Sequence, residues 1–366
     1  MHWLKTADTV IVGSGSLAQG IVYALSQVAK DSLRVAIIGR SAAKISRIAL
    51  IANARAETFH VPATFCALAI RDFRALAFSR AFRSLKPKVI LLAASLQSPW
   101  ESSQGQNAWT KLIASGGFGI TLPLQLALAA ELSRGATDSK AAIVNACYPD
   151  CVNVVLHRLQ LPVTCGVGNA AIVEAFCASR DSMGQDGTGR GGLAVGKVKV
   201  VAHHGQLSAW LRGKASESQP RVWVKDREKN SLRLRPNFGD IRDDLNGVTA
   251  ATATPVLLSL LTGEILHTSI PGVAGMPGGY PFVLKDGRFV LRLPSGLTTG
   301  QAIAHNKKGE RLDGLDLESD AKFTGKARRA LAEANFEYAE GFDLAGWPKV
   351  CSKLVALRER LRQVKV

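Results

Sequence analysis

The sequence has few cysteines and no long run of apolar residues. Six cysteines in 366 residues are too few for a disulfide-dense secreted scaffold, so we expect a reducing, cytoplasmic setting. The longest apolar runs, such as 89–94, are far shorter than the ~20 residues of a membrane span. Residues 1–9 lack the apolar core of a targeting segment. We therefore expect a folded protein with no membrane partner.

Acidic residues are also in short supply. The 46 Lys and Arg against 29 Asp and Glu give a formal net charge of +17. A nucleic-acid-binding protein often concentrates such an excess on one element, whereas here basic residues are spread along the whole chain. We therefore expect a solvated surface, or one that attracts acidic small molecules, and no nucleic-acid partner.

A short β-branched segment, 9–12, is followed at once by a glycine turn. Residues 13–18 read Gly-Ser-Gly-Ser-Leu-Ala, which is the G-x-G-x-x-A spacing of a dinucleotide-binding turn. Gly13 permits the tight turn, Gly15 lets a pyrophosphate approach the backbone, and Ala18 lets the next helix pack closely on the strand. The position of the motif between a predicted strand and a predicted helix favours dinucleotide binding over a turn without function.

Three further cofactor contacts follow from this placement. The amides of Ser16 and Leu17 open the helix predicted over 16–29 and would face the phosphates. Ala94 ends another predicted strand, 88–94, and ligands of open α/β sheets bind at the carboxyl ends of strands.

The second predicted strand, 33–38, indicates which dinucleotide binds. NAD-binding proteins usually place a carboxylate about 20 residues after the glycine turn to hold the ribose 2′-hydroxyl. Here the strand is followed by Arg40 and Ser41, with Lys44 one turn later. These residues favour NADP(H) over NAD(H). The alternative is that Arg40 is a solvated loop residue that stacks on the adenine of either cofactor.

Strands and helices alternate over 1–150, with a helical stretch at 122–134 and another strand at 142–145. This order predicts an α/β fold with a doubly wound parallel sheet. We assign residues 151–366 to a second, α+β domain, in which 282–293 is a predicted hairpin.

The order of motifs resembles that of the lactate/malate dehydrogenase superfamily over most of the chain. The resemblance begins with the glycine turn. It continues with 145–168, which resembles the family's N-P…G-L-P…G-x-G stretch, and with 202–205 (Ala-His-His-Gly), which resembles its G-E-H-G segment. It implies an N-terminal Rossmann domain, a C-terminal substrate domain, hydride transfer to or from a small molecule, and a homo-oligomer, dimer or tetramer.

The resemblance also implies roles for individual residues. His204 falls on the family's catalytic histidine, which exchanges a proton with the substrate oxygen, and a histidine suits this task because it titrates near neutral pH. Asn145 would contact the nicotinamide or a substrate oxygen, and Thr249 matches a substrate-side threonine. Gln97 lies in the loop that follows the fourth strand and would offer the substrate a neutral polar contact. The alternatives are a turn-forming Asn145 and a helix-capping Thr249.

The sequence departs from the family at the charged positions. Ile172 stands where the family has the aspartate that pairs with its histidine, and Ala175 stands where it has a substrate-binding arginine. The loop 95–107 contains no Arg or Lys. A small 2-keto acid would lose its charge-assisted contacts, so we expect a different substrate. Asp150 is a second candidate to orient the histidine.

Two other classes of protein stay open. NAD-using glycosidases share this architecture and hold a metal with a cysteine and a histidine, for which Cys165 and His204 are the pair to consider. We assign no metal ligand, because buried cysteines more often pack as small apolar side chains. A dinucleotide-binding protein without turnover is the other alternative.

Overall fold

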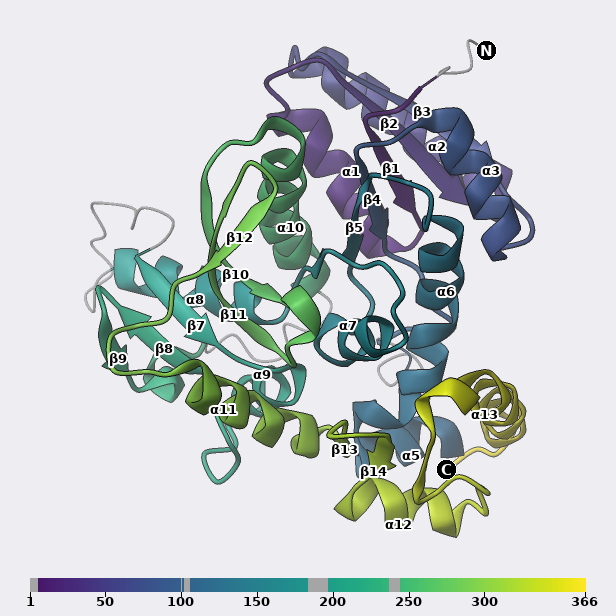
Figure 1. Ribbon diagram of the computed structural model, residues 1–366, viewed down its shortest axis with the longest axis vertical. Coiled ribbons are helices and arrows are strands. Elements are labelled where there is room, and N and C mark those ends of the chain that lie inside the picture. The colour runs from purple at the N-terminus through teal and green to yellow at the C-terminus, as the bar shows by residue number, and fades with distance from the viewer. Residues whose placement is uncertain (1–5, 100, 102–105, 184–196, 237–243) are drawn as a thin grey trace.

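The computed structural model describes the chain except residues 1–5, 100, 102–105, 184–196 and 237–243 (Figure 1). A six-stranded sheet has the order β3-β2-β1-β4-β5-β6, and each neighbouring pair is parallel. Its strands are β1 (Thr9–Val12), β2 (Leu33–Gly39), β3 (Ala63–Ala69), β4 (Val89–Leu92), β5 (Ala142–Asn145) and β6 (Cys165–Gly166). The strand order reverses between β1 and β4, as in a doubly wound fold. The predicted Rossmann-type sheet is confirmed.

Helices cover both faces of this sheet. One face carries α1 (Ser16–Val28), α2 (Ala42–Thr58) and α10 (Leu245–Thr262). The other carries α3 (Ala75–Leu85), α6 (Leu122–Gly135) and α7 (Pro149–Arg158), and α5 (Ala108–Gly116) joins the same buried cluster. Side chains alternate along β1, so that Val10 and Val12 enter one core and Ile11 enters the other. Burial on both faces explains why the strands read as continuous apolar runs.

The later part of the chain forms three antiparallel sheets and the helices between them. The strands are β7 (Val198–Val201), β8 (Arg221–Val224) and β9 (Arg227–Lys229); β10 (Leu266–Pro271), β11 (Gly279–Lys285) and β12 (Arg288–Leu291); and β13 (Leu315–Asp316), β14 (Ala321–Phe323) and β15 (Gly341–Phe342). The helices are α8 (Ala170–Met183), α9 (His204–Leu211), α11 (Thr299–Leu312), α12 (Gly325–Glu333) and α13 (Trp347–Arg362). The predicted hairpin is formed by β11 and β12, with Asp286 and Gly287 between them. These elements give the α+β half that the sequence predicts.

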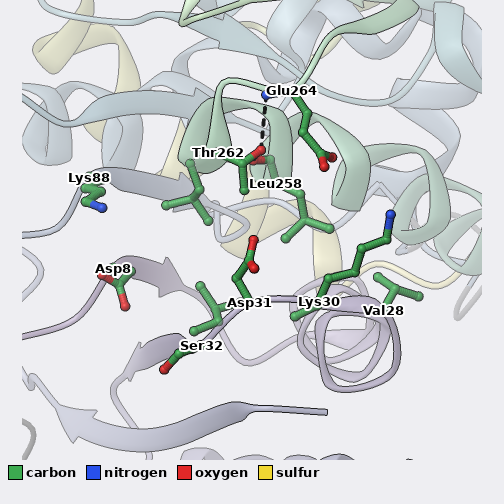
Figure 2. Close-up of a pocket in the computed structure, with 12 residues that line it drawn as sticks. Asp8, Val28, Lys30, Asp31, Ser32, Lys88, Leu258, Thr262 and Glu264 are labelled. Carbon is green, nitrogen blue, oxygen red and sulfur yellow. Dashed lines mark hydrogen bonds between the residues drawn. The ribbon is translucent and has the colours of Figure 1, made fainter.

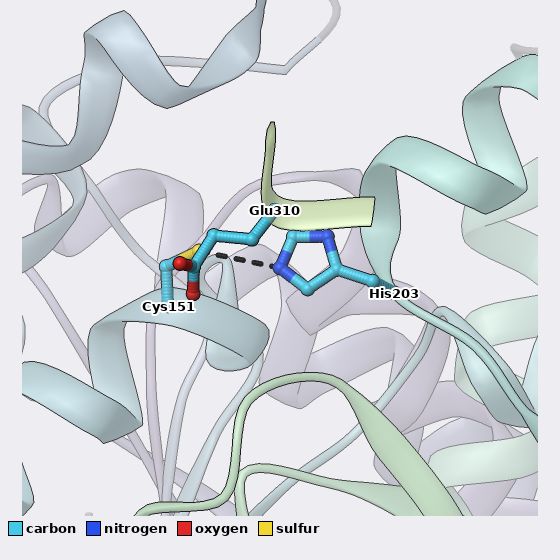
Figure 3. Close-up of side chains that lie close together, drawn as sticks. All are labelled: Cys151, His203 and Glu310. Carbon is cyan, nitrogen blue, oxygen red and sulfur yellow. Dashed lines mark hydrogen bonds between the residues drawn. The ribbon is translucent and has the colours of Figure 1, made fainter. Parts of the chain in front are cut away.

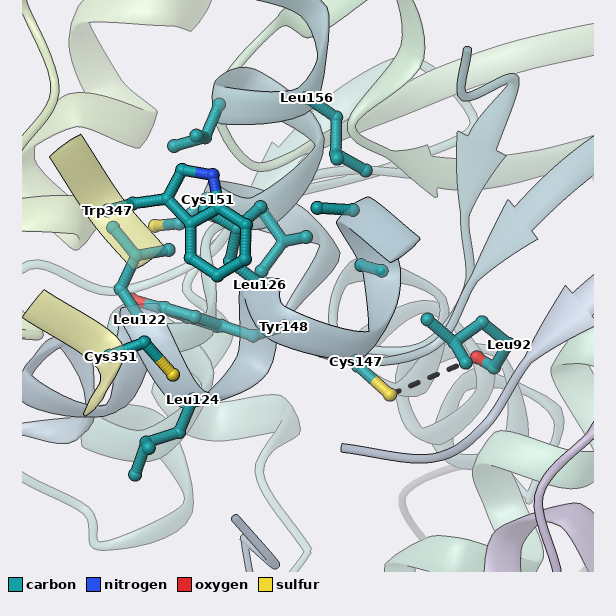
Figure 4. Packing of buried hydrophobic residues seen from close by; sticks show 14 of the residues in the cluster. Leu92, Leu122, Leu124, Leu126, Cys147, Tyr148, Cys151, Leu156, Trp347 and Cys351 are labelled. Carbon is teal, nitrogen blue, oxygen red and sulfur yellow. Dashed lines mark hydrogen bonds between the residues drawn. The ribbon is translucent and has the colours of Figure 1, made fainter. Parts of the chain in front are cut away.

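The two halves do not divide cleanly at residue 150. Strand β6 lies beyond that residue and still pairs with β5 in the parallel sheet. The C-terminal helix α13 packs against α6, where Trp347 joins Leu122 and Leu126 in one buried cluster (Figure 4). The end of the chain therefore completes the core of the first half.

Helix α10 is 18 residues long and apolar enough by length and composition to cross a membrane. It is nevertheless 44% buried within the molecule, and it packs along α1. The approach is close, because a Cβ atom at Gly20 would lie 3.1 Å from the Cβ of Ala250. Most of the buried apolar residues of α10 therefore belong to the core that it shares with α1.

Candidate active site

A cavity of about 1300 Å³ opens at the carboxyl edge of the parallel sheet. One side is formed by segments at or directly after the strand ends, 13–17, 39–41, 93–95 and 146–149. Other lining residues come from the segment from α5 to α6 and from α8, α9, α10, α11 and α12. Open α/β sheets bind ligands at this edge, where the strand order reverses. Both halves of the chain therefore contribute to one cavity.

The glycine turn lies at the sheet side of this cavity. Gly13 has φ of +143°, and a Cβ atom there would lie 2.4 Å from the carbonyl oxygen of Ala93, so only glycine fits. A Cβ atom at Gly15, in contrast, would meet nothing within 4 Å. Gly15 is also the N-cap of α1, so the free amides at the start of that helix border open space. This is the surface that a pyrophosphate requires.

The other contacts predicted at this edge, Ser16, Leu17 and Ala94, also line the cavity. The hydroxyl of Ser16 accepts a hydrogen bond of 2.7 Å from Nδ2 of Asn246 on α10. The start of α1 is thereby tied to the second half of the chain at the cavity wall.

At the end of β2, Arg40 and Ser41 line the cavity, and both are exposed. The Ser41 hydroxyl accepts a hydrogen bond of 3.3 Å from the backbone amide of Lys44 and so caps α2. Lys44 is exposed on α2 and does not line the cavity. Of the three residues predicted at this strand end, Arg40 and Ser41 therefore lie at the cavity and Lys44 does not.

His204 begins α9 and lines the same cavity. Its Nδ1 lies 2.8 Å from Oδ2 of Asp313, which also accepts a hydrogen bond of 3.0 Å from the hydroxyl of Tyr148. The backbone amide of His204 donates to Oδ1 of Asp150 at 3.1 Å, and its ring lies 4.8 Å from that of Phe118. Among the described residues Nε2 has no hydrogen-bond partner, which leaves it for a ligand in the cavity.

The electrostatic surroundings of His204 and Asp313 favour the charged form of each side chain. Burial alone would lower the pKa of His204, but the charge and hydrogen bond of Asp313, together with Asp150, raise it above the ordinary value. Burial alone would raise the pKa of Asp313, but His204 and then His203 hold it below the ordinary value. The pair is therefore an imidazole with an ionised carboxylate behind it, the arrangement that stabilises a proton on the ring.

Asn145 is a correction to the sequence interpretation. It is 1% exposed and does not line the cavity. Its Oδ1 accepts from the amide of Cys147 at 2.8 Å, and its Nδ2 donates to Oδ1 of Asn153 at 2.9 Å. The polar side-chain atoms of Asn145 are therefore hydrogen-bonded within the turn after β5. Asn145 is a turn-forming residue, which was the alternative given above.

Gln97 is a second correction, because it is 1% exposed and also absent from the cavity wall. Its Oε1 accepts from the indole of Trp109 at 3.1 Å, and its Nε2 donates to Glu101 at 2.7 Å. It organises the loop after β4, of which residues 100 and 102–105 lie outside the described part of the chain.

Thr249 lines the cavity as predicted, but its hydroxyl donates to the carbonyl of Leu245 one turn earlier, at 2.8 Å. Helix α10 begins at Leu245, so Thr249 does not cap it. Its methyl group lies beside Gly168, another lining residue, since a Cβ atom there would be 3.5 Å from Cγ2 of Thr249.

The charged partners come from positions that the resemblance did not indicate. Ile172 lines the cavity without charge, whereas Ala175 is not part of its wall. Glu174 turns away and accepts from the amide of Ser269 at 2.6 Å. Asp313, from a segment without any recognisable motif, is the carboxylate that holds His204.

The cavity wall is rich in cations. Among the described residues that line it, the acidic side chain is that of Asp313, and the basic ones are Arg40, Arg212, Lys214 and Lys326. Asp313 is already occupied by His204. Arg212 and Lys214 are ion-paired with Glu217, at 3.4 and 3.5 Å, so the positive charge that would favour an anionic ligand is greatest at Arg40 and Lys326.

Comparison with known proteins places this geometry in a wider setting. No protein-family profile and no curated protein matches the sequence. Among solved structures, the chain is similar to the lactate dehydrogenase of Cryptosporidium parvum, whose structure was solved with lactic acid and nicotinamide adenine dinucleotide. The TM-score is 0.52 at 14% identity, over 86% of this chain and 100% of that one. The likeness is one of fold.

The cysteine–histidine pair considered from the sequence is wrong. Cys165 is fully buried in the core between the sheet and α10, and it does not line the cavity in which His204 lies. A smaller cavity of about 310 Å³, lined by Asp8, Lys30 and Glu264 among others, lies where β1 and β2 begin (Figure 2). That is the amino edge of the sheet, where open α/β folds do not bind their ligands.

Proposed function

We propose that this protein is an NAD(P)(H)-dependent oxidoreductase that transfers hydride to or from a carbonyl or imine carbon, with NADP(H) preferred. The observation that carries the proposal is that the paired His204 and Asp313 line the same cavity as the glycine turn. The cavity therefore has a diphosphate-binding end and a proton-exchanging end.

The residues of the turn fit a dinucleotide. Open space at Gly15 and the free amides of α1 would receive the diphosphate, and Arg40 would meet a 2′-phosphate as a guanidinium–phosphate pair. When bound, the nicotinamide supplies or accepts the hydride. No carboxylate among the described lining residues lies beside Arg40 to select a free 2′-hydroxyl, which supports NADP(H).

His204 would hold the proton that balances the hydride. In reduction, Nε2 would give a proton to the substrate oxygen or nitrogen, and in oxidation it would remove one. Asp313 fixes the ring through Nδ1 and stabilises the imidazolium. Phe118 and Tyr148 pack on the ring and restrict its rotation.

The cations indicate the substrate class. Arg212, at the end of α9, Lys214 and Lys326 line the cavity, so the substrate would be a carbonyl or imine compound with an anionic group. Ile172 and Ala175 lack the charges that clamp a small 2-keto acid in the dehydrogenases that the sequence resembles. We therefore propose a larger substrate than lactate or malate.

Cofactor titration tests the proposal directly. Energy transfer from tryptophan to the nicotinamide should report micromolar binding of NADPH and at least about tenfold weaker binding of NADH. Arg40→Ala should remove most of that preference. Arg47→Ala, on the exposed side of α2, is the matched control and should leave it unchanged.

Absence of binding by either nucleotide at millimolar concentration would overturn the proposal. Binding without NADPH oxidation in any screen of anionic carbonyl compounds would favour a dinucleotide-binding protein without turnover. Release of a sugar by the NAD-loaded protein would favour the glycosidase-like alternative.

A further inference from the structure

Three buried side chains from distant parts of the chain meet behind the cavity wall (Figure 3). Cys151 lies on α7, His203 directly precedes α9, and Glu310 lies on α11; they are 0, 0 and 2% exposed, respectively. Their ligating atoms all lie within 4.8 Å of one another, and Sγ of Cys151 is 3.4 Å from Nε2 of His203. None of the three lines the cavity, so this cluster is separate from the proposed active site.

Close packing of α11 on His203 brings the three side chains together. A Cβ atom at Gly309 would lie 2.4 Å from the Cβ of His203, so a glycine is needed there for α11 to reach the histidine. Oε1 of Glu310 accepts from the amide of Leu317 at 2.7 Å, whereas Oε2 has no hydrogen-bond partner among the described residues. One oxygen thus anchors the side chain and leaves the other for a ligand.

The donor set selects the kind of ion. Thiolate, imidazole and carboxylate together suit zinc, whereas magnesium and calcium prefer oxygen ligands alone. Neighbouring ligand atoms of a tetrahedral zinc site lie roughly 3.3–3.8 Å apart. The sulfur–nitrogen distance already falls in this range. The carboxylate of Glu310 would need to move by on the order of 1 Å.

The charges around the three side chains also favour a bound cation. Asp150, Asp313 and Glu310 are buried carboxylates, and in the described part of the chain none of them forms a salt bridge with an Arg or Lys. The groups that face Asp313 are two imidazoles, with Nδ1 of His203 at 3.6 Å and Nδ1 of His204 at 2.8 Å. Buried carboxylates are ordinarily paired or bound to metal, so a divalent cation would offset the excess of acidic groups.

We propose that Cys151, His203 and Glu310 bind one zinc ion, with water as the fourth ligand. Coordination releases the Cys151 thiol proton to solvent, because the thiolate is the ligand. In the present structure Nδ1 of His203 accepts from the amide of Gly205 at 3.2 Å. With zinc on Nε2, the ring proton moves to Nδ1, which gives up the bond from the Gly205 amide and donates toward Oδ2 of Asp313, now 3.6 Å away.

The proposed zinc site would be linked to the cavity through the side chain of Asp313. The same Oδ2 lies 2.8 Å from Nδ1 of His204, so one carboxylate stands behind both histidines. The ion would hold α7, α11 and the start of α9 together, and with them the position of Asp313.

Cobalt substitution tests this proposal without any activity assay. The full chain, freed of metal by a chelator and dialysed, is titrated with CoCl2 and then with ZnCl2. We expect one equivalent of Co²⁺ to give a thiolate-to-cobalt charge-transfer band in the near ultraviolet, which one equivalent of zinc abolishes. Cys151→Ser should lose the band, and Glu310→Gln should weaken cobalt binding at least tenfold.

Cys165→Ser is the matched control, because Cys165 is equally buried but lies in another core. It should keep the band. Far-ultraviolet circular dichroism identifies any variant that fails to fold; if Cys151→Ser fails, Glu310→Gln decides, since Gln keeps the bond to the Leu317 amide. No equimolar binding at ~100 μM Co²⁺, or a band that persists in Cys151→Ser, would overturn the proposal.

Discussion

At the scale of single residues, His204 is distinguished by having one ring nitrogen held and the other free. Asp313 binds Nδ1 at 2.8 Å, and Nε2 is left to the cavity. His204→Gln should therefore abolish NADPH oxidation with any substrate found in the screen, while the NADPH dissociation constant changes less than about twofold. Steady-state kinetics and the energy-transfer titration measure the two effects separately.

Asp313 should act through the histidine. We expect Asp313→Asn to lower turnover about 10²-fold or more, because the amide no longer stabilises an imidazolium. Tyr148→Phe removes a bond to the same carboxylate oxygen and is the matched control, with an expected loss of less than tenfold. Equal losses in both variants would argue against an electrostatic role for Asp313.

Glu174 gives a residue-scale prediction about pH and stability. Burial raises its pKa to about 7, although the Ser269 amide opposes the shift. A carboxyl group whose pKa is higher in the folded than in the unfolded state stabilises the folded protein when it is protonated. This contribution is complete below the unfolded-state pKa and is lost as pH rises through about 7.

Glu174→Gln keeps an acceptor for the Ser269 amide but cannot ionise. The free energy of unfolding of the variant, relative to the wild type, should therefore rise by on the order of 2 kcal/mol between pH 5.5 and pH 8. Urea unfolding at the two pH values measures the difference. A constant difference would show that the carboxyl group is not held neutral in the fold.

At the scale of elements, helix α13 fastens the loop after β4. Nε and Nη2 of Arg362 each donate to Glu101 at 2.7 Å, and Nε2 of Gln97 donates to the same carboxylate. Arg358 donates to the carbonyl of Leu96. Segments far apart in the sequence are thus joined by a bidentate, partly buried pair.

Arg362→Ala should lower the free energy of unfolding by about 1–2 kcal/mol, because it leaves the carboxylate of Glu101 partly buried without its partner. Hydrogen exchange at Leu96 and Gln97 should become faster. Lys349→Ala, at an exposed position of the same helix, is the control and should change neither quantity.

At the scale of the whole molecule, the cavity belongs to both halves of the chain. Strand ends of the parallel sheet and the segment from α5 to α6 line it together with residues of α8 to α12. A ligand there should stabilise the folded chain as one unit. NADPH at about 100 times its dissociation constant should raise the free energy of unfolding by about 2.7 kcal/mol.

Urea unfolding with and without NADPH measures this stabilisation, and Arg40→Ala should reduce it at the same NADPH concentration. Stabilisation of only an early transition, with a later one unaffected, would show that the two halves unfold independently and that the cavity is not shared.

The sequence was informative where a local pattern has a local cause. The strands predicted at 9–12, 33–38, 88–94 and 142–145, the glycine turn and the hairpin each follow from side-chain periodicity or backbone conformation within a few residues, and each is present in the structure. Strands β3 and β6 of the same sheet were not predicted. Arg40 and Thr249 were likewise placed in the cavity wall. Asn145 and Gln97 were misjudged, because polar residues next to a cavity can satisfy their hydrogen bonds inside the protein instead.

The doubly wound sheet and the glycine turn could be predicted from the sequence, because both are set by short-range sterics and by burial that repeats along each strand. The contact between Asp313 and His204, and the meeting of Cys151, His203 and Glu310, could be seen only once the chain was folded. Those groups come from separate helices and from turns between elements, so packing alone determines which of them become neighbours.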